Sequence, residues 1–232
     1  MLRFFFLVIS FSLFISGFSQ QNEPEIIDKT QHNQIVDSNL KSEFGIYYSI
    51  FRIYKYSDNI GLHYLILTER TVDSSADEPR NDSIMAFHFT KENEKMKLDW
   101  KLRDFVVKQS IGDNLESSIW FWSKYFQLKD IDNDGIVEPL LVYGSSGING
   151  KDDGRIKIFV FYKGKKYGIR HQNGVYDGDR NTKVDKEFYD LPNAVVLESI
   201  AIMEKIVEDN NAIFPYGWQK AMKEKKVFFS EN

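Results

Sequence analysis

Residues 97–105 read KLDWKLRDF, and apolar and charged side chains alternate from Lys97 to Arg103. In an extended strand, the apolar side chains would lie on one face and the charged side chains on the other. The apolar face holds Leu98, Trp100 and Leu102, and the charged face holds Lys97, Asp99, Lys101 and Arg103. A period of two residues indicates a β-strand with one buried and one solvated face. Strands of that kind belong mostly to antiparallel sheets. The stretch therefore predicts an antiparallel β-sheet.

The sequence on either side of this strand has the same β-rich character. Residues 46–54, 62–67 and 83–89 are aromatic and β-branched runs, and a turn signal at residues 57–59 separates the first two. Residues 155–162 and 165–170 flank Lys163-Gly164 and predict a β-hairpin. We expect these segments to be strands of a mainly antiparallel sheet.

The pattern changes to a helical one near Leu191. Val196, Ile200, Met203 and Val207 recur at the spacing of one helix face, and a second short helix is expected over residues 217–225. Strands that precede helices indicate an α+β fold. We expect a mainly antiparallel β-sheet with one or two C-terminal helices packed on it, forming a single domain over residues 43–232.

The first 20 residues differ from the rest. Arg3 precedes an apolar run of residues 4–15, and Gly17 and Ser19 are small residues before Gln20. This layout is typical of a signal peptide over residues 1–19, and an uncleaved anchor or a buried helix is the alternative. Residues 20–42 are polar and predict a flexible leader. The expected location is therefore periplasmic or extracellular, with no transmembrane segment after signal removal.

Composition narrows the functional classes. The 232 residues carry a formal net charge of -4, which does not favour nucleic acid as a partner. The sequence has no cysteine, which excludes disulfides, thiolate metal sites and a cysteine nucleophile. Histidines 32, 63, 88 and 171 show no paired metal spacing, and we expect His63 and His88 to be structural or surface residues.

One motif carries a recognisable chemistry. Residues 130–138 read DIDNDGIVE and place carboxylates at positions 1, 3, 5 and 9, with glycine at position 6. Calcium prefers six to eight oxygen ligands, which a tight loop with this spacing can supply. The expected structural calcium ligands are Asp130, Asp132, Asp134 and Glu138, together with the carbonyl of Ile136. Four later acids are candidates to complete the shell: Asp152, Asp153, Asp177 and Asp179.

Other interpretations of this loop stay open. An EF-hand is excluded because its twelfth position, which needs a glutamate, is Leu141, and because strands rather than helices flank the loop. A metal-free polar turn and a catalytic magnesium or manganese site are the alternatives. The nearby cluster Trp120, Phe121, Trp122, Tyr125 and Phe126 predicts core, with a sugar-binding platform as its alternative.

The loop resembles the strand–loop–strand calcium loop of FG-GAP and VCBS repeats, although only one copy is present. The longer stretch of residues 126–170 resembles small secreted bacterial proteins that are labelled as surface polysaccharide biosynthesis proteins. The resemblance rests on Leu128 to Glu138, on Tyr143 and on the hairpin with Gly164, Lys166, Tyr167 and Arg170. Members often carry a cysteine after the strand that ends in tyrosine, and this sequence lacks it.

These observations define two expectations for function. The first is a secreted or periplasmic, non-catalytic protein of the bacterial cell envelope that has a structural calcium loop and a glycan or another envelope protein as its partner. The alternative is an enzyme that acts on surface glycan. The sequence assigns no catalytic residue. A pocket beside the loop that holds two carboxylates with perturbed pKa values favours the enzyme.

Overall fold

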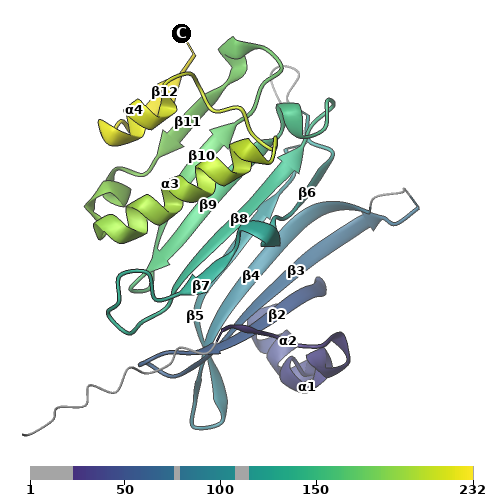
Figure 1. Ribbon diagram of the computed structural model, residues 1–232. Coiled ribbons are helices and arrows are strands. Elements are labelled where there is room, and N and C mark those ends of the chain that lie inside the picture. Colours follow the sequence, from purple (N-terminus) through teal and green to yellow (C-terminus); the bar gives the residue numbers. More distant parts are fainter. Residues whose placement is uncertain (1–22, 76–78, 108–114, 232) are drawn as a thin grey trace, which may run out of the picture.

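The computed structural model describes residues 23–75, 79–107 and 115–231. The expected signal peptide, residues 1–19, lies outside the described residues. The fold is α+β, as expected, but the strands form two antiparallel sheets rather than one (Figure 1). No helix in the described ranges has the length and apolar character needed to cross a membrane.

The N-terminal sheet has five strands in sequence order. They are β1 (Glu25–Ile26), β2 (Ser49–Ser57), β3 (Leu62–Asp73), β4 (Arg80–Glu92) and β5 (Lys95–Phe105). The C-terminal sheet has the order β12 (Phe228–Ser230), β11 (Asn181–Val184), β10 (Lys165–Gln172), β9 (Arg155–Tyr162), β8 (Glu138–Ser146) and β6 (Ser118–Phe121), with β7 (Gln127–Lys129) also paired to β8. The predicted hairpin is the β9–β10 pair, in which Tyr162 lies opposite Lys165.

The two sheets pack face to face and form the central core of the molecule. Alternate residues of β3 and β8, such as Leu65 and Leu141, meet there in one buried cluster. The opposite residues, such as Ile66 and Leu140, belong to clusters on the outer faces. Both sheets are therefore apolar on both faces, because each face has a partner.

Helices cover the two outer faces, which gives four layers (Figure 1). Helix α3 (Asn193–Glu208) and helix α4 (Trp218–Lys223) cover the C-terminal sheet, as the sequence predicts. Met203 and Trp218 are buried against that face. Short 3-10 helices connect the elements: η1 (Lys29–Gln31), η2 (Ser123–Tyr125), η3 (Lys151–Asp153), η4 (Asp177–Asp179) and η5 (Lys186–Asp190).

The described part of the predicted flexible leader is folded. Residues 25 and 26 pair with β2 as β1, and helices α1 (His32–Ile35) and α2 (Ser38–Phe44) follow. The carboxylate of Asp37 caps α2 by accepting the N–H of Leu40 at 2.8 Å. Ile27 and Val36 are buried against the outer face of the N-terminal sheet. This segment is the layer that shields that face from water.

The alternation of residues 97–105 is interrupted at Asp99. His88 lies opposite Trp100, but the next residue of β4, Phe89, lies opposite Leu98, so Asp99 is the extra residue of a β-bulge. Leu98 consequently packs toward the N-terminal helices, whereas Trp100 and Leu102 pack toward the other sheet. The expectation of one apolar face for all three residues is wrong for Leu98.

The aromatic cluster near residue 120 is core, as expected. Phe121 is buried between the two sheets, and Trp122 and Tyr125 are buried under the C-terminal helices. The chain alternates between these two layers along β6 and η2. The cluster therefore presents no open platform of the kind that stacks on a sugar.

Candidate metal centre

The acidic loop connects two paired strands. Strands β7 and β8 are antiparallel, with Leu128 opposite Pro139 and Lys129 opposite Glu138. The predicted strand–loop–strand arrangement is therefore present, and the loop of residues 130–137 is the connection of a hairpin in the C-terminal sheet. Two of its residues, Asn133 and Gly135, have φ angles of 61° and 87°, which tighten the turn.

Backbone N–H groups of the loop bind its own carboxylates. Asp130 accepts the N–H groups of Asp134 at 3.0 Å and Gly135 at 2.8 Å. Asp134 in turn accepts the N–H of Ile136 at 3.0 Å. The aspartate side chains are thereby turned toward the inside of the loop, as a chelating loop requires.

The four predicted carboxylate ligands converge. Each of Asp130, Asp132, Asp134 and Glu138 offers a carboxylate oxygen within 4.8 Å of the others. Glu138 is 1% exposed and accepts the N–H of Ile131 at 2.7 Å. Burial, together with the negative charges of the three aspartates, raises the pKa of Glu138 to about 7, although the hydrogen bond from Ile131 acts in the opposite direction. A bound cation would relieve this repulsion.

Two side chains of the β9–β10 hairpin also reach the loop. The hydroxyl of Tyr162 donates to Asp132 Oδ2 at 3.0 Å, and Lys163 Nζ lies 3.1 Å from Asp134 Oδ2. Both contacts are on the solvent side, since Lys163 is 56% exposed. One exposed lysine does not balance four carboxylates.

The loop is docked onto the other sheet through the turn between β2 and β3. Asn59 donates its N–H to the carbonyl of Gly135 at 2.9 Å, and Val137 donates its N–H to Asp58 Oδ2 at 3.1 Å. A Cβ atom at Gly135 would lie 1.8 Å from Asn59 Nδ2, so only glycine fits. The acidic loop therefore joins the two sheets at one end of the sandwich.

The remaining predicted ligands have different outcomes. Ile136 lies in the loop and its N–H is bound by Asp134, but its role as a carbonyl ligand stays a prediction. Within the described ranges, the carboxylate group at the loop contains none of the four later acids, Asp152, Asp153, Asp177 and Asp179. Asp153 instead accepts the N–H of Asn149, and Asp177 pairs with Arg180.

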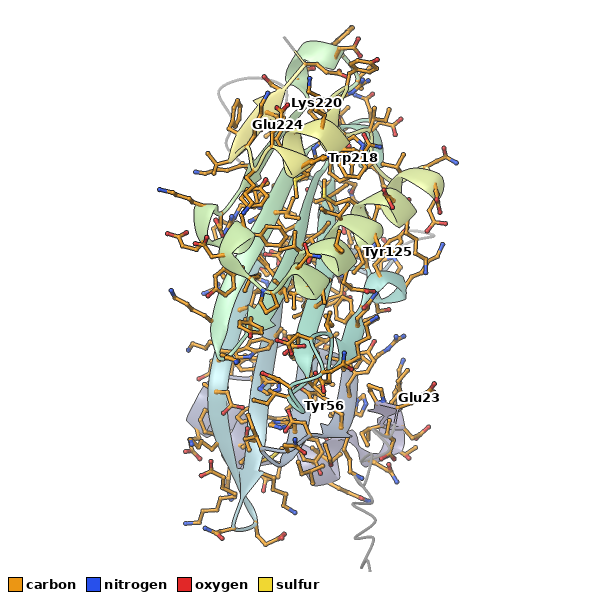
Figure 2. The ribbon with its side chains drawn as sticks, turned by 60° about the vertical axis from the view of Figure 1, so that its left-hand side comes forward. Glu23, Tyr56, Tyr125, Trp218, Lys220 and Glu224 are labelled. Atoms are coloured by element: carbon orange, nitrogen blue, oxygen red, sulfur yellow. The ribbon has the colours of Figure 1, made fainter. Side chains whose placement is uncertain are left out.

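A pocket of about 360 Å³ lies directly beside the loop, between the ends of the two sheets. The N-terminal sheet supplies its polar side, and Val137, Phe161 and Lys163 line the other. Figure 2 shows Tyr56, which lines the pocket, in the lower half of the molecule, and Trp218, Lys220 and Glu224 near the opposite end. The acidic loop therefore borders a concave site rather than an isolated convex surface.

The polar side of the pocket is a histidine–carboxylate cluster. His63 Nε2 lies 2.8 Å from Asp58 Oδ1, and His88 Nδ1 lies 2.8 Å from Asp99 Oδ2. Both histidines are buried, so the expectation of structural or surface residues holds only in its first part. Spacing along the chain did not reveal this cluster, because three strands contribute to it.

Both carboxylates of the pocket are held in the ionised form. Burial raises the pKa of Asp58, but hydrogen bonds from His63, Val137 and Ile60 outweigh it and bring the pKa below its ordinary value. Asp99 shows the same balance, with His88 supplying the main lowering contact. Burial lowers the pKa of His88 and raises that of Tyr56, so both stay neutral near pH 7.

Comparisons with known proteins add nothing to this geometry: no protein-family model, no curated protein and no solved structure matches the chain. The resemblance of residues 126–170 to secreted polysaccharide-related proteins therefore stays a prediction from the sequence.

Proposed function

We propose that this chain is an exported, non-catalytic protein of the bacterial cell envelope that binds one structural calcium ion in residues 130–138. The observation that carries the proposal is the convergence of Asp130, Asp132, Asp134 and Glu138 in one hairpin loop. These four side chains present only oxygen atoms, which suits a hard cation such as calcium.

The proposed export of the protein and the proposed calcium site are consistent with each other. An exported protein meets calcium at millimolar concentration, where even a weak loop of the extracellular type is filled. The signal-like layout of residues 1–19 and the lack of cysteine fit such a compartment.

The position of the loop supports a structural role for the ion. The loop belongs to the C-terminal sheet, and Gly135 and Val137 bind the turn at Asp58 and Asn59 in the N-terminal sheet. An ion that binds the folded loop and not the unfolded chain stabilises the folded state by linkage. Calcium would therefore act as a clamp between the sheets.

A glycan or another envelope protein remains the proposed partner, and the support for a glycan is the resemblance alone. Trp100 in the pocket offers no free ring face for a sugar, because His88 and Phe161 stack on it with centroid distances of 5.1 Å and 3.6 Å.

The enzyme alternative has one observation in its favour, the pocket beside the loop that contains Asp58 and Asp99. Glycoside hydrolysis usually needs one of two carboxyl groups to stay protonated as a general acid. The pKa values of Asp58 and Asp99 are both lowered, so neither fits that role. Asp58 and Asp99 therefore do not form the acid–base pair of a glycoside hydrolase, but the pocket itself remains the observation that supports the enzyme alternative.

Thermal unfolding with and without calcium tests the proposal. At about a tenfold excess of calcium over its dissociation constant, linkage adds about 1.4 kcal/mol, which raises the melting temperature of a chain of this size by roughly 3–6 °C. Asp132→Ala should abolish the rise. Asp152→Ala is the matched control, because it removes one exposed carboxylate outside the cluster. An unchanged melting curve of the wild type at millimolar calcium would rule out the calcium clamp.

A further inference from the structure

Three neighbouring strands bring metal-binding side chains to one point on the pocket floor. His63 of β3 lies opposite Thr90 of β4, and His88 is two residues before Thr90, so both histidines share one face of the sheet. The bulge in β5 brings Asp99 onto the same cluster. A nitrogen from each histidine and an oxygen of Asp99 lie within 4.8 Å of one another.

The orientation of each histidine ring is fixed by a hydrogen bond at its Nε2 atom, on the side away from the proposed metal. His63 Nε2 is held by Asp58 at 2.8 Å, and His88 Nε2 by the hydroxyl of Tyr56 at 2.5 Å. Each ring therefore directs its Nδ1 atom toward Thr90 and Asp99. Histidines that bind metals usually have their second nitrogen held in this way by a carboxylate or another polar group.

Five contacts join six side chains of the pocket in one series: Asp58, His63, Thr90, Asp99, His88 and Tyr56. The three candidate ligands therefore belong to one connected polar network.

The geometry points to a binding site for a divalent transition metal such as zinc at His63 Nδ1, His88 Nδ1 and Asp99 Oδ2. Two imidazoles and one carboxylate are a ligand set for borderline metals, in contrast to the all-oxygen acidic loop. The metal would take the place of the hydrogen between His63 and Thr90. The pocket leaves room for water or an external ligand at the remaining coordination positions.

Zinc titration calorimetry on the full chain, with calcium present in excess so that the acidic loop does not compete, tests this site. We expect one zinc ion per chain. His88→Gln should abolish binding. Asp58→Asn, which leaves all three ligands in place, should weaken binding by about 10- to 100-fold.

His32→Gln is the matched control, because His32 is also buried but contacts the carbonyl of Ile27 under the N-terminal helices, away from the pocket. Its zinc affinity should equal that of the wild type. If His88→Gln does not fold, the visible spectrum of the wild type with cobalt decides: a tetrahedral site gives intense d–d bands, which added zinc suppresses by displacing the cobalt. A wild type that binds no zinc below millimolar concentration, or a folded His88→Gln that binds as well as the wild type, would overturn the proposal.

Discussion

His171 and His63 are buried histidines with two ring contacts each, but their surroundings differ in charge. His171 Nε2 lies 2.8 Å from Asn173 Oδ1 and its Nδ1 lies 2.9 Å from the Thr182 hydroxyl. A neutral ring satisfies both contacts, because Thr182 can donate and the Asn173 oxygen accepts. His63 lies between the carboxylate of Asp58 and a hydroxyl that already donates to Asp99. Both partners of the His171 ring are uncharged, whereas one partner of the His63 ring is a carboxylate.

The environment of His171 predicts a loss of stability in acid. Burial lowers its pKa from 6.5 to about 4 in the folded state. Between these values the unfolded chain takes up a proton that the folded chain does not, so the free energy of unfolding falls as the pH falls from 6.5 to 4. The loss approaches about 3 kcal/mol near pH 4. Urea unfolding of wild type and His171→Gln across this range checks it.

The variant should be less stable near pH 7, because a buried side chain is replaced, but its free energy of unfolding should depend less steeply on pH. The difference between the two slopes isolates His171 from the carboxylates, which titrate in both proteins. Equal slopes for the two proteins would contradict the assignment of a low pKa to His171.

At the level of single residues, the acidic loop could be predicted from the sequence, but the histidine–carboxylate cluster of the pocket could not. Asp130, Asp132 and Asp134 are so close in the chain that local spacing alone predicts their convergence, which the structure confirms. His63 and Asp99 are 36 positions apart in the sequence. They meet only because β3, β4 and β5 pair in a particular register. No local pattern contains that information.

At the level of elements, the segment before β2 shows how tertiary packing creates short helices. Helix α1 has four residues and α2 has seven, which is too short for stability in isolation. Their apolar residues, Ile35 and Leu40 among them, are isolated in a polar sequence and show no sustained period. They fold because Ile66 and Phe87 of the sheet offer an apolar face. The sequence pattern therefore predicted a flexible leader over residues 20–42, whereas the described part of this segment forms a folded layer on the N-terminal sheet.

A buried residue of this layer gives a direct test. Val36 is fully buried, so Val36→Ala should lower the free energy of unfolding by roughly 2 kcal/mol through lost burial and a small cavity. Chemical denaturation measures this value. The matched control is Gln34→Ala, two residues away and exposed, which should change stability by less than about 0.5 kcal/mol. A flexible leader would give no effect in either variant.

The bulge at Asp99 explains why a clear alternation was partly misread. One extra residue moves every side chain before it to the other face of the sheet. Leu98 therefore belongs to the layer of the N-terminal helices, while Trp100 belongs to the interface between the sheets. Period-two reasoning identified the strand correctly, but an uninterrupted pattern carries no sign of a bulge.

At the level of the whole molecule, polar contacts hold the two sheets together beside the apolar core. The acidic loop binds the β2–β3 turn at one place, as described above. At another place, Arg155 of β9 pairs with Glu116 and lies 3.3 Å from Asp104 of β5, and Lys157 lies 2.6 Å from Asp104. Burial raises the pKa of Asp104, but the two cations outweigh it and lower the pKa.

This ion cluster predicts a large effect of one substitution. Arg155→Met leaves the carboxylate of Glu116, which is 5% exposed, without its guanidinium partner. We expect a loss of about 3 kcal/mol in the free energy of unfolding, because the buried charge is no longer compensated. Arg103→Met, on the exposed side of β5, should change it by less than about 0.5 kcal/mol. Denaturant unfolding of both variants makes the comparison, and equal small effects would show that the cluster does not tether the sheets.

The α+β class and the late helix α3 followed from the sequence, but the N-terminal helices, the last strand β12 and the arrangement in layers did not. The alternation of side chains in a strand predicts which residues share a face of the sheet, but it does not predict which element covers that face. Leu140 and Leu141 are both fully buried, one under the C-terminal helices and one against the other sheet. The number of sheets depends on such long-range choices.

The central claim is that residues 130–138 bind calcium. Titration calorimetry of the metal-free full chain with calcium tests it most directly. The account predicts one ion per chain with a dissociation constant in the micromolar to millimolar range, no binding by Asp132→Ala, and wild-type binding by Asp152→Ala. Absence of binding by the wild type at millimolar calcium, or undiminished binding by Asp132→Ala, would contradict it.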